Sequence, residues 1–259
     1  EGAPLPITAY IAVGSKVAAF ALVLRLFAEG LLPAIDQWNL LIAGMAALTM
    51  LFGNLVALAQ TNVKRMLAYS SVGQVGFLLM GIAALSTLSS NGLMVHLVGY
   101  SVTNLAVFFA ITAFYNVTGK EEIADFAGLA ARSPFLAAAI TVSLFSLAGL
   151  PFLAGFVTKF YLFSAAAAED LLWLAGVAMV ASLISLYYYL NVIREMYISP
   201  SAEGEDGIIQ TPNLLYGLVS VLVIFVIFIG VYPDPVVNII EDATAVILPA
   251  GGAATFNFR

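Results

Sequence analysis

The sequence of 259 residues has no cysteine, one histidine and few charges, which together are only 9% of its residues. Without cysteine the chain can form no disulfide, no thiolate metal site and no thiol nucleophile. A single histidine cannot build a multi-histidine metal site. The sequence also lacks a catalytic serine motif, a pair of catalytic acids and a glycine-rich phosphate loop. We therefore expect no metal, no redox centre and no cofactor in this chain.

Hydrophobic residues, in contrast, make up 62% of the sequence. Soluble domains carry about a quarter charged residues, so this composition predicts an all-α protein that crosses a lipid bilayer several times. The net charge of −6 offers no basic surface for nucleic acid. No charged segment with a following cleavage site opens the sequence, so we expect no signal peptide. We expect residues 1–259 to form a single transmembrane domain.

Apolar runs predict about seven transmembrane helices joined by short loops. The expected spans are Ile7–Phe27, Leu40–Gln60, Met66–Leu85, Leu93–Val117, Pro134–Ala168, Leu171–Tyr197 and Leu214–Tyr232. The remainder, residues 233–259, is too short and too interrupted to span the bilayer. We expect it to lie along the membrane surface as a C-terminal tail.

The fifth span is too long for one straight helix. It would extend roughly 50 Å, whereas the hydrocarbon core of a bilayer is roughly 30 Å thick. Pro151 has no N–H and clashes with the carbonyl four residues earlier, and Gly149 loosens the backbone. We therefore predict a break at Gly149, Leu150 and Pro151, between the half-helices Phe135–Ala148 and Phe152–Ala168. Such a break at membrane depth is tolerated only where it lines a protein-buried or watery cavity.

The basic residues predict the orientation. Seven alternating spans place five of them on one side and two on the other: Lys64, Arg65, Lys120, Arg132 and Arg194 against Arg25 and Arg259. The positive-inside rule makes the first side cytoplasmic. The C-terminus then lies on the non-cytoplasmic side.

Lys16 and Lys159 are the two charges within the predicted spans that cannot easily reach an interface. Insertion scales put the cost of a charge at a helix centre at roughly 2.5–3.5 kcal/mol, so such residues generally have a function. Burial in a low-dielectric site disfavours the charged form of an amine, so a buried lysine gives up its proton more easily than one in water, which suits a proton carrier. The alternative is structural: each lysine reaches a headgroup or pairs with an acid.

A polar stripe on the fourth span comprises His96, Tyr100 and Asn104, at helical spacing on one face. A histidine with hydroxyl and amide neighbours can pass protons through water, but the same set is also typical of interhelical hydrogen bonds. We leave these two interpretations open. Weaker positions, more typical of helix packing, are Ser70, Gln74, Ser182, Ser185 and Tyr189.

Four runs of sequence carry a family resemblance: FGNLVALAQTNVKRMLAYSSVGQVGF (52–77), SLAGLPFLAGFVTKFYLF (146–163), EGAPLPITAYIAVGSK (1–16) and SLYYYLNVI (185–193). In these runs the chain resembles the antiporter-like membrane subunits of respiratory complex I. Three details favour the subunit N type. These are Thr61-Asn62 where sister subunits usually have Thr-Asp, a lysine in the first span, and lysine rather than glutamate in the broken span.

The resemblance implies an architecture of fourteen helices with two inverted five-helix repeats. The seven spans would then be helices eight to fourteen, the C-terminal half with one repeat unit, and the break would be the family's discontinuous twelfth helix. Lys16 would be the connecting lysine of helix eight and Lys159 the terminal lysine of helix twelve. Lys64 and Tyr69 match family positions at the junction of helices nine and ten; from composition alone, Lys64 would be a topology and headgroup residue. His96 departs from the family, which has mostly apolar or aromatic residues at this position.

The expected function is that of a proton-translocating subunit of NADH-quinone oxidoreductase, with no redox chemistry of its own. The predicted proton path comprises Lys16, Lys64, Tyr69, His96, Tyr100 and Lys159. NADH, flavin, iron–sulfur clusters and quinone would bind to partner subunits, and other membrane subunits would be its neighbours. We expect a bacterial-type inner (plasma) membrane or a thylakoid membrane. The alternatives are a subunit of an Mrp-type Na+/H+ antiporter or of a membrane-bound hydrogenase, and a scaffold that moves no protons.

Overall fold

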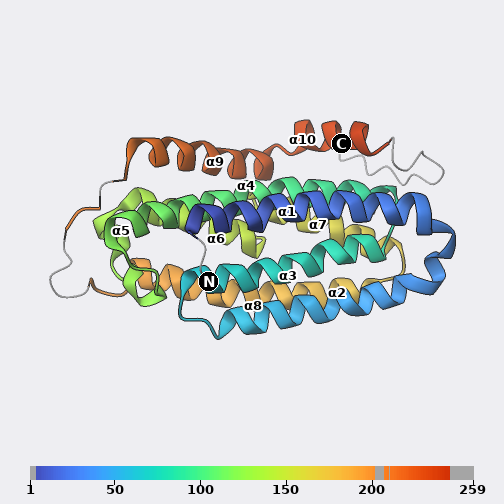
Figure 1. Cartoon of the computed structure of the whole chain (residues 1–259), viewed down its shortest axis with the longest axis horizontal. Coiled ribbons are helices and arrows are strands. Elements are labelled where there is room, and N and C mark those ends of the chain that lie inside the picture. Colours follow the sequence, from blue (N-terminus) through green and yellow to red (C-terminus); the bar gives the residue numbers. More distant parts are fainter. Residues whose placement is uncertain (1–3, 202–206, 210, 246–259) are drawn as a thin grey trace.

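The structure, a computed structural model, describes residues 4–201, 207–209 and 211–245 (Figure 1). Its helices are α1 (Leu5–Arg25), α2 (Ile35–Leu58), α3 (Val63–Ala83), α4 (Thr87–Thr118), α5 (Leu129–Arg132), α6 (Pro134–Ala148), α7 (Ala154–Ala168), α8 (Leu172–Tyr197), α9 (Asn213–Val231) and α10 (Asp234–Thr244). Within the described ranges there is no β-strand, only an isolated bridge between Asn62 and Glu122. The all-α prediction is confirmed there.

Among the described residues, five helical stretches are long and apolar enough to cross a membrane. They are Leu5–Leu58, Val63–Ala83, Thr87–Thr118, Leu172–Tyr197 and Asn213–Val231. The first contains a reversal, because a π-helical turn (Leu26–Leu31) and a 3-10 turn (Leu32–Ala34) bend the chain between α1 and α2 (Figure 1). Two shorter apolar helices, α6 and α7, complete the bundle. The lengths and the apolar composition of these helices are therefore those of a protein that crosses a membrane several times.

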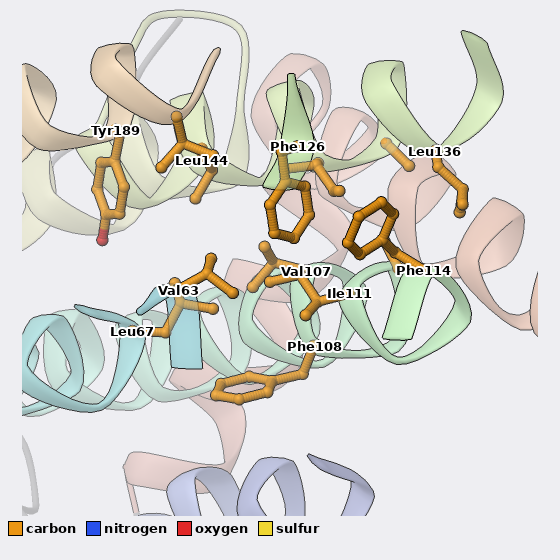
Figure 2. Packing of buried hydrophobic residues seen from close by; sticks show 14 of the residues in the cluster. Val63, Leu67, Val107, Phe108, Ile111, Phe114, Phe126, Leu136, Leu144 and Tyr189 are labelled. Carbon is orange, nitrogen blue, oxygen red and sulfur yellow. The ribbon is translucent and has the colours of Figure 1, made fainter. Parts of the chain in front are cut away.

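The longest helix, α4, lies at the centre of the bundle. It packs against α1, α6, α7, α9 and α10, while α2 packs mainly on α3 and α8. Figure 2 shows the apolar core near the C-terminal part of α4, where Val107, Ile111 and Phe114 lie on the side of the loop that carries Phe126, and Phe108 points to the opposite side of the helix. The rings of Phe114 and Phe126 stack with their centroids 4.3 Å apart. This core attaches the polar loop after α4 to the end of the bundle.

Helices α2 and α3 approach each other closely because glycines face each other between them. A Cβ on Gly53 would lie 3.0 Å from the carbonyl oxygen of Tyr69 and closer still to the backbone of Gly73. Asn54, the next residue, is buried and donates to the carbonyl of Met50 over 2.7 Å. The small residues of this pair thus bring α3 and its polar side chains into the centre of the molecule.

The predicted break is confirmed. Helix α6 ends at Ala148, and Gly149 takes a left-handed conformation (φ 92°) whose N–H donates to the carbonyl of Phe145 over 3.1 Å. Helix α7 resumes at Ala154, two residues later than expected, since Phe152 also has a positive φ of 66°. The turn through Gly149, Leu150 and Pro151 leaves the end of α6 facing the start of α7.

The loops that carry most of the basic residues meet at one end of the bundle. The N–H of Val63 donates to the carbonyl of Glu121 over 3.0 Å, and the N–H of Ile123 donates to that of Thr61 over 2.7 Å. The N–H of Gly128 donates to Glu195 near the end of α8 over 3.2 Å. Lys64, Arg65, Lys120, Arg132 and Arg194 therefore share this end, and Arg25 lies at the other. Arg259 lies outside the described residues.

The predicted surface tail, residues 233–259, lies partly outside the described residues. Its described part forms α10, which follows α9 alongside α4 (Figure 1). Val237 and Ile240 pack against Val95, and the hydroxyl of Thr244 donates to the side chain of Asn91. The location of this tail at the membrane surface stays a prediction.

Candidate functional site

Lys159, in the second turn of α7, points back across the break at the end of α6. Its side chain is buried with the residue only 3% exposed, and its Nζ donates to the carbonyl of Leu147 over 2.9 Å and of Ala148 over 3.1 Å. The Leu147 carbonyl would normally accept from the N–H four residues later, but that residue is Pro151, which has none. The break thus creates the acceptors that hold the ammonium, at the negative end of the α6 dipole.

Two more contacts complete the surroundings of Lys159. Its Nζ lies 3.3 Å from the hydroxyl of Ser182 on α8 and 4.6 Å from the centroid of the Phe77 ring on α3. Among the described residues no carboxylate pairs with it. A cavity of about 220 Å³, lined mostly by apolar side chains, has Lys159 and Ser182 in its wall. An ammonium with neutral partners can lose its proton without leaving an acid unpaired.

Lys16, on α1, is half-buried and binds α3 and α4. Its Nζ donates to the carbonyl of Ser71 over 2.7 Å and also to the Ser71 hydroxyl. The Tyr100 hydroxyl lies 3.2 Å from the same Nζ and 2.8 Å from the Ser71 hydroxyl. Tyr100 also approaches the carbonyl of Ala12 at 3.3 Å. Lys16, Ser71 and Tyr100 therefore form one hydrogen-bonded group.

His96 lies one helical turn from Tyr100 on α4, between the two lysine groups. It is buried, and its Nδ1 is 3.0 Å from the hydroxyl of Thr158, the residue before Lys159. The centroids of the His96 and Tyr100 rings are 6.4 Å apart. The centroids of the His96 and Phe77 rings are 6.2 Å apart. His96 and Tyr100 thus lie on the same side of α4, as their spacing predicts. A role for them in proton transfer stays a prediction.

A cavity of about 10 Å³ lies beside His96. Its lining comprises Gln74, His96, Gly99, Tyr100, Thr103, Ser146, Leu147, Gly155, Thr158 and Lys159. Two buried polar atoms of these side chains, His96 Nε2 and Gln74 Oε1, have no hydrogen-bond partner among the described residues. Asn104, the third residue of the predicted stripe, is buried but does not line this cavity.

Lys64 and Tyr69 lie apart from this group, at the basic end of the bundle. They line a different cavity, of about 410 Å³, together with Thr8, Asn62, Arg65, Ala68 and Glu121. Asn62 caps α3 there, its side chain accepting from the N–H of Arg65 over 3.1 Å. This cavity contains both charged and hydroxyl groups, so its composition suits water and protons rather than an apolar ligand.

Sequence reasoning missed Ser71 and Thr158, the direct partners of Lys16 and His96. Their only sequence signal was a hydroxyl residue within an apolar run, next to Ser70 and Lys159. It also gave Ser182 only a packing role, although this residue contacts Lys159. These partners come from other helices, so their roles depend on how the helices are packed.

A second polar group connects α2, α3 and α8. The hydroxyl of Tyr188 donates to the side chain of Asn54 over 2.9 Å, and the hydroxyls of Ser70 and Tyr189 are hydrogen-bonded. Tyr187, in contrast, is 61% exposed. The tyrosine run therefore places two side chains in the core and one outside it.

Comparison with known proteins identifies the family. Residues 1–185 match the family model described as NADH:quinone oxidoreductase/Mrp antiporter, TM. The chain belongs to this family. It is 46% identical over 240 residues to NADH-quinone oxidoreductase subunit N of Moorella thermoacetica, covering 92% of this chain and 50% of that protein. The resemblance seen in the sequence is thus confirmed for the family, and subunit N proteins are among the relatives.

Chains of two solved membrane complexes have a similar fold. A chain of the archaeal membrane-bound sulfane sulfur reductase complex superposes with a TM-score of 0.86 at 29% identity, covering 95% of this chain and 50% of that one. A chain of respiratory complex I from Thermus thermophilus gives a TM-score of 0.76 at 25% identity, covering 88% and 49%. The chain spans about half the length of the curated relatives it matches.

Proposed function

We propose that this chain is the C-terminal half of the proton-translocating membrane subunit of an NADH-quinone oxidoreductase, the subunit N type. The relatives' names and the half-length match support this assignment. The chain would cross the membrane seven times, with α6 and α7 forming one interrupted crossing. These crossings would be helices eight to fourteen of the family, with one inverted repeat unit.

The observation that carries the proposal is that Lys16 and Lys159, both within the bundle, are held by neutral acceptors and have polar side chains between them. Lys16 would exchange protons through Tyr100, and Lys159 through the gap at the helix break. His96 lies between them. Two ammonium groups close together in a low-dielectric site disfavour each other, so a charge change at one lysine would release a proton at the other.

The cavity at Lys64 and Tyr69 would be the aqueous approach to this path from the basic end of the bundle. The positive-inside rule makes that end cytoplasmic and places the C-terminus on the opposite side. The membrane would be a bacterial plasma membrane or a thylakoid membrane. Electron transfer through NADH, flavin, iron–sulfur clusters and quinone would occur in partner subunits, and neighbouring membrane subunits would transmit its effect.

The test uses membrane vesicles that contain the full-length subunit in its complex. Lys159→Met keeps the side-chain volume but removes the ammonium, and Lys120→Ala, in the loop after α4, is the control. Substrate-driven acidification and quinone reduction are measured together and normalised to assembled complex. We expect acidification to fall to the background leak in Lys159→Met and to stay at the wild-type rate in Lys120→Ala. Wild-type acidification by fully assembled Lys159→Met would reject the proposal and favour a scaffold role.

The family description also covers Mrp antiporters, which makes a Na+/H+ antiporter subunit the second candidate. The same vesicles separate the two. Proton uptake or release driven by a Na+ gradient without NADH or quinone would favour the antiporter. Proton movement that requires quinone reduction and ignores Na+ would favour the oxidoreductase.

A further inference from the structure

We propose that the cavity beside His96 binds one ordered water molecule, which donates hydrogen bonds to His96 Nε2 and to Gln74 Oε1. We further propose that Thr158 is a positioning residue that keeps His96 Nε2 free of hydrogen. The water site itself stands on geometry alone, whereas its role in proton transfer rests on the proposed function.

The hydrogen-bond partners of Thr158 determine which nitrogen of His96 carries the hydrogen. The Thr158 hydroxyl lies 3.3 Å from the carbonyl oxygen of Gly155, which can only accept, so the hydroxyl donates to it. Its oxygen is then available to accept from His96 Nδ1, 3.0 Å away. In a neutral imidazole, hydrogen on Nδ1 leaves Nε2 as an acceptor.

The orientation of the Gln74 side chain is determined in the same way. Its Nε2 lies 3.3 Å from the carbonyl of Leu147, the same oxygen that accepts from Lys159. Since a carbonyl only accepts, this end of the amide is the NH₂ group and the other end is the acceptor Oε1. Both atoms that lack a partner, His96 Nε2 and Gln74 Oε1, are therefore acceptors.

The hydroxyls of Thr103 and Ser146 in the cavity wall cannot supply the missing donors. The Thr103 hydroxyl donates to the carbonyl of Gly99 over 2.7 Å. It therefore accepts from the Ser146 hydroxyl, 3.0 Å away, so the hydrogen of Ser146 is also used. A water has two O–H donors, one for each unpartnered acceptor. Leaving two buried acceptors unpaired would be costly.

The size of the cavity matches one water. Its volume of about 10 Å³ is close to the space that a single water centre requires, and an ordered buried water usually has two to four polar partners. Tyr100 and Lys159 line the same space. The water would therefore lie between the Lys16 group and Lys159. In the proton transfer, the Tyr100 hydroxyl would give its proton to the water and take one from the Lys16 ammonium. The water would then give a proton to His96 Nε2, which leaves Lys16 neutral and His96 as an imidazolium.

The direct test is cryo-electron microscopy of the assembled complex at a resolution that shows other buried waters of this subunit. We expect a density peak within hydrogen-bond distance of the side chains of both His96 and Gln74 in the wild type, and its loss in Gln74→Leu. A wild-type map with other buried waters but no peak at this position would reject the water site.

The role of Thr158 is tested by Thr158→Val, which keeps the shape but removes the acceptor for Nδ1. Thr112→Val is the matched control, since Thr112 is a buried threonine of α4 whose hydroxyl donates within its own helix to Phe108. We expect substrate-driven acidification per assembled complex to fall about fivefold in Thr158→Val, which loses one hydrogen bond, and to be largely restored in Thr158→Ser. In His96→Leu, which loses the proton acceptor itself, we expect a fall of about a hundredfold. Thr112→Val keeps the wild-type rate.

The acidification rates of the Lys159, Thr158 and His96 variants together distinguish an error in this inference from an error in the proposed function. If Lys159→Met stops acidification while Thr158→Val and His96→Leu acidify at the wild-type rate, the relay through His96 is wrong and proton translocation stands. If Lys159→Met also acidifies normally, the proposed function itself is wrong.

Discussion

Pro151 determines both the break in the bundle and the chemistry beside it. Because it has no N–H, the carbonyl of Leu147 is left without its helical partner. Two side chains use that oxygen, Lys159 over 2.9 Å and Gln74 over 3.3 Å. Pro151 thus does more than interrupt the helix, because it leaves the Leu147 carbonyl available to accept from the buried ammonium of Lys159.

We expect the hydroxyl of Tyr100 to contribute to proton exchange at Lys16. Tyr100→Phe keeps the ring, 5.1 Å from the Lys16 ammonium, but removes the hydroxyl that contacts both Lys16 and Ser71. Loss of one hydrogen bond is worth about 1 kcal/mol, so we expect acidification to slow about fivefold. The rate is measured per assembled complex in vesicles.

Tyr115→Phe is the control for this variant, because Tyr115 lies on the same helix but is 40% exposed. We expect its rate to be unchanged. Equal rates in Tyr100→Phe and the wild type would show that the hydroxyl takes no part in proton movement.

The sequence predicted the residues with unusual chemistry but, apart from Tyr100, not the residues that bind them. Lys16, His96 and Lys159 were identifiable because a charge or an imidazole in an apolar run needs an explanation. Ser71 and Thr158 could not be distinguished from packing residues. Which helix face meets which neighbour depends on the rotation of α3 and α7 in the bundle, and periodicity within one helix does not contain that information.

Among the elements, the ends of the helices differ most from the prediction. The third span was expected from Met66, but α3 begins at Val63. Lys64 and Arg65 are too polar to be counted in an apolar span. They are nevertheless helical, because the side chain of Asn62 caps the helix just before them. The break was predicted correctly because its signal, glycine and proline within an apolar run, is local.

We expect the conformation of the turn between α6 and α7 to depend on Gly149. In Gly149→Ala the new Cβ would lie 3.1 Å from Cδ of Lys159, in a backbone conformation with φ 92°. A left-handed conformation costs a residue other than glycine about 1–2 kcal/mol, so we expect a lower midpoint of thermal unfolding for the purified complex and slower acidification. Gly176→Ala on α8, with nothing within 4 Å of its Cβ, is the control and should be as stable as the wild type or slightly more so. Unchanged unfolding in Gly149→Ala would mean that the turn adapts.

Helices α2 and α3 are packed so closely at Gly53 that a larger side chain there should destabilise the bundle. A Cβ in Gly53→Ala would lie 2.9 Å from the Cα of Gly73. Overpacking of this kind costs about 1–3 kcal/mol, so we expect a lower unfolding midpoint and less assembled complex. Gly44→Ala, on the same helix with no atom within 4 Å of its Cβ, should assemble normally. Normal assembly of both variants would contradict the close packing of these helices.

At the scale of the whole molecule, the described bundle has a basic end and an end with few basic residues. The backbone bonds between the α2–α3 turn and the loop after α4 bring most of the basic side chains together. The proton path proposed here would run between these ends through the centre of the bundle. Its direction across the membrane therefore depends on which end faces the cytoplasm.

The lack of cysteine in the sequence makes this orientation measurable with single cysteines. Ala124→Cys lies in the loop after α4, and Glu29→Cys and Glu169→Cys lie at the opposite end; all three positions are exposed. If seven crossings alternate with the basic end in the cytoplasm, a membrane-impermeant maleimide added to intact cells should label positions 29 and 169 but not 124. Permeabilised cells should show labelling at 124, and denatured protein should show it at all three positions. The reverse pattern would invert the orientation, whereas labelling of 124 and 169 from the same side would contradict the interrupted crossing by α6 and α7.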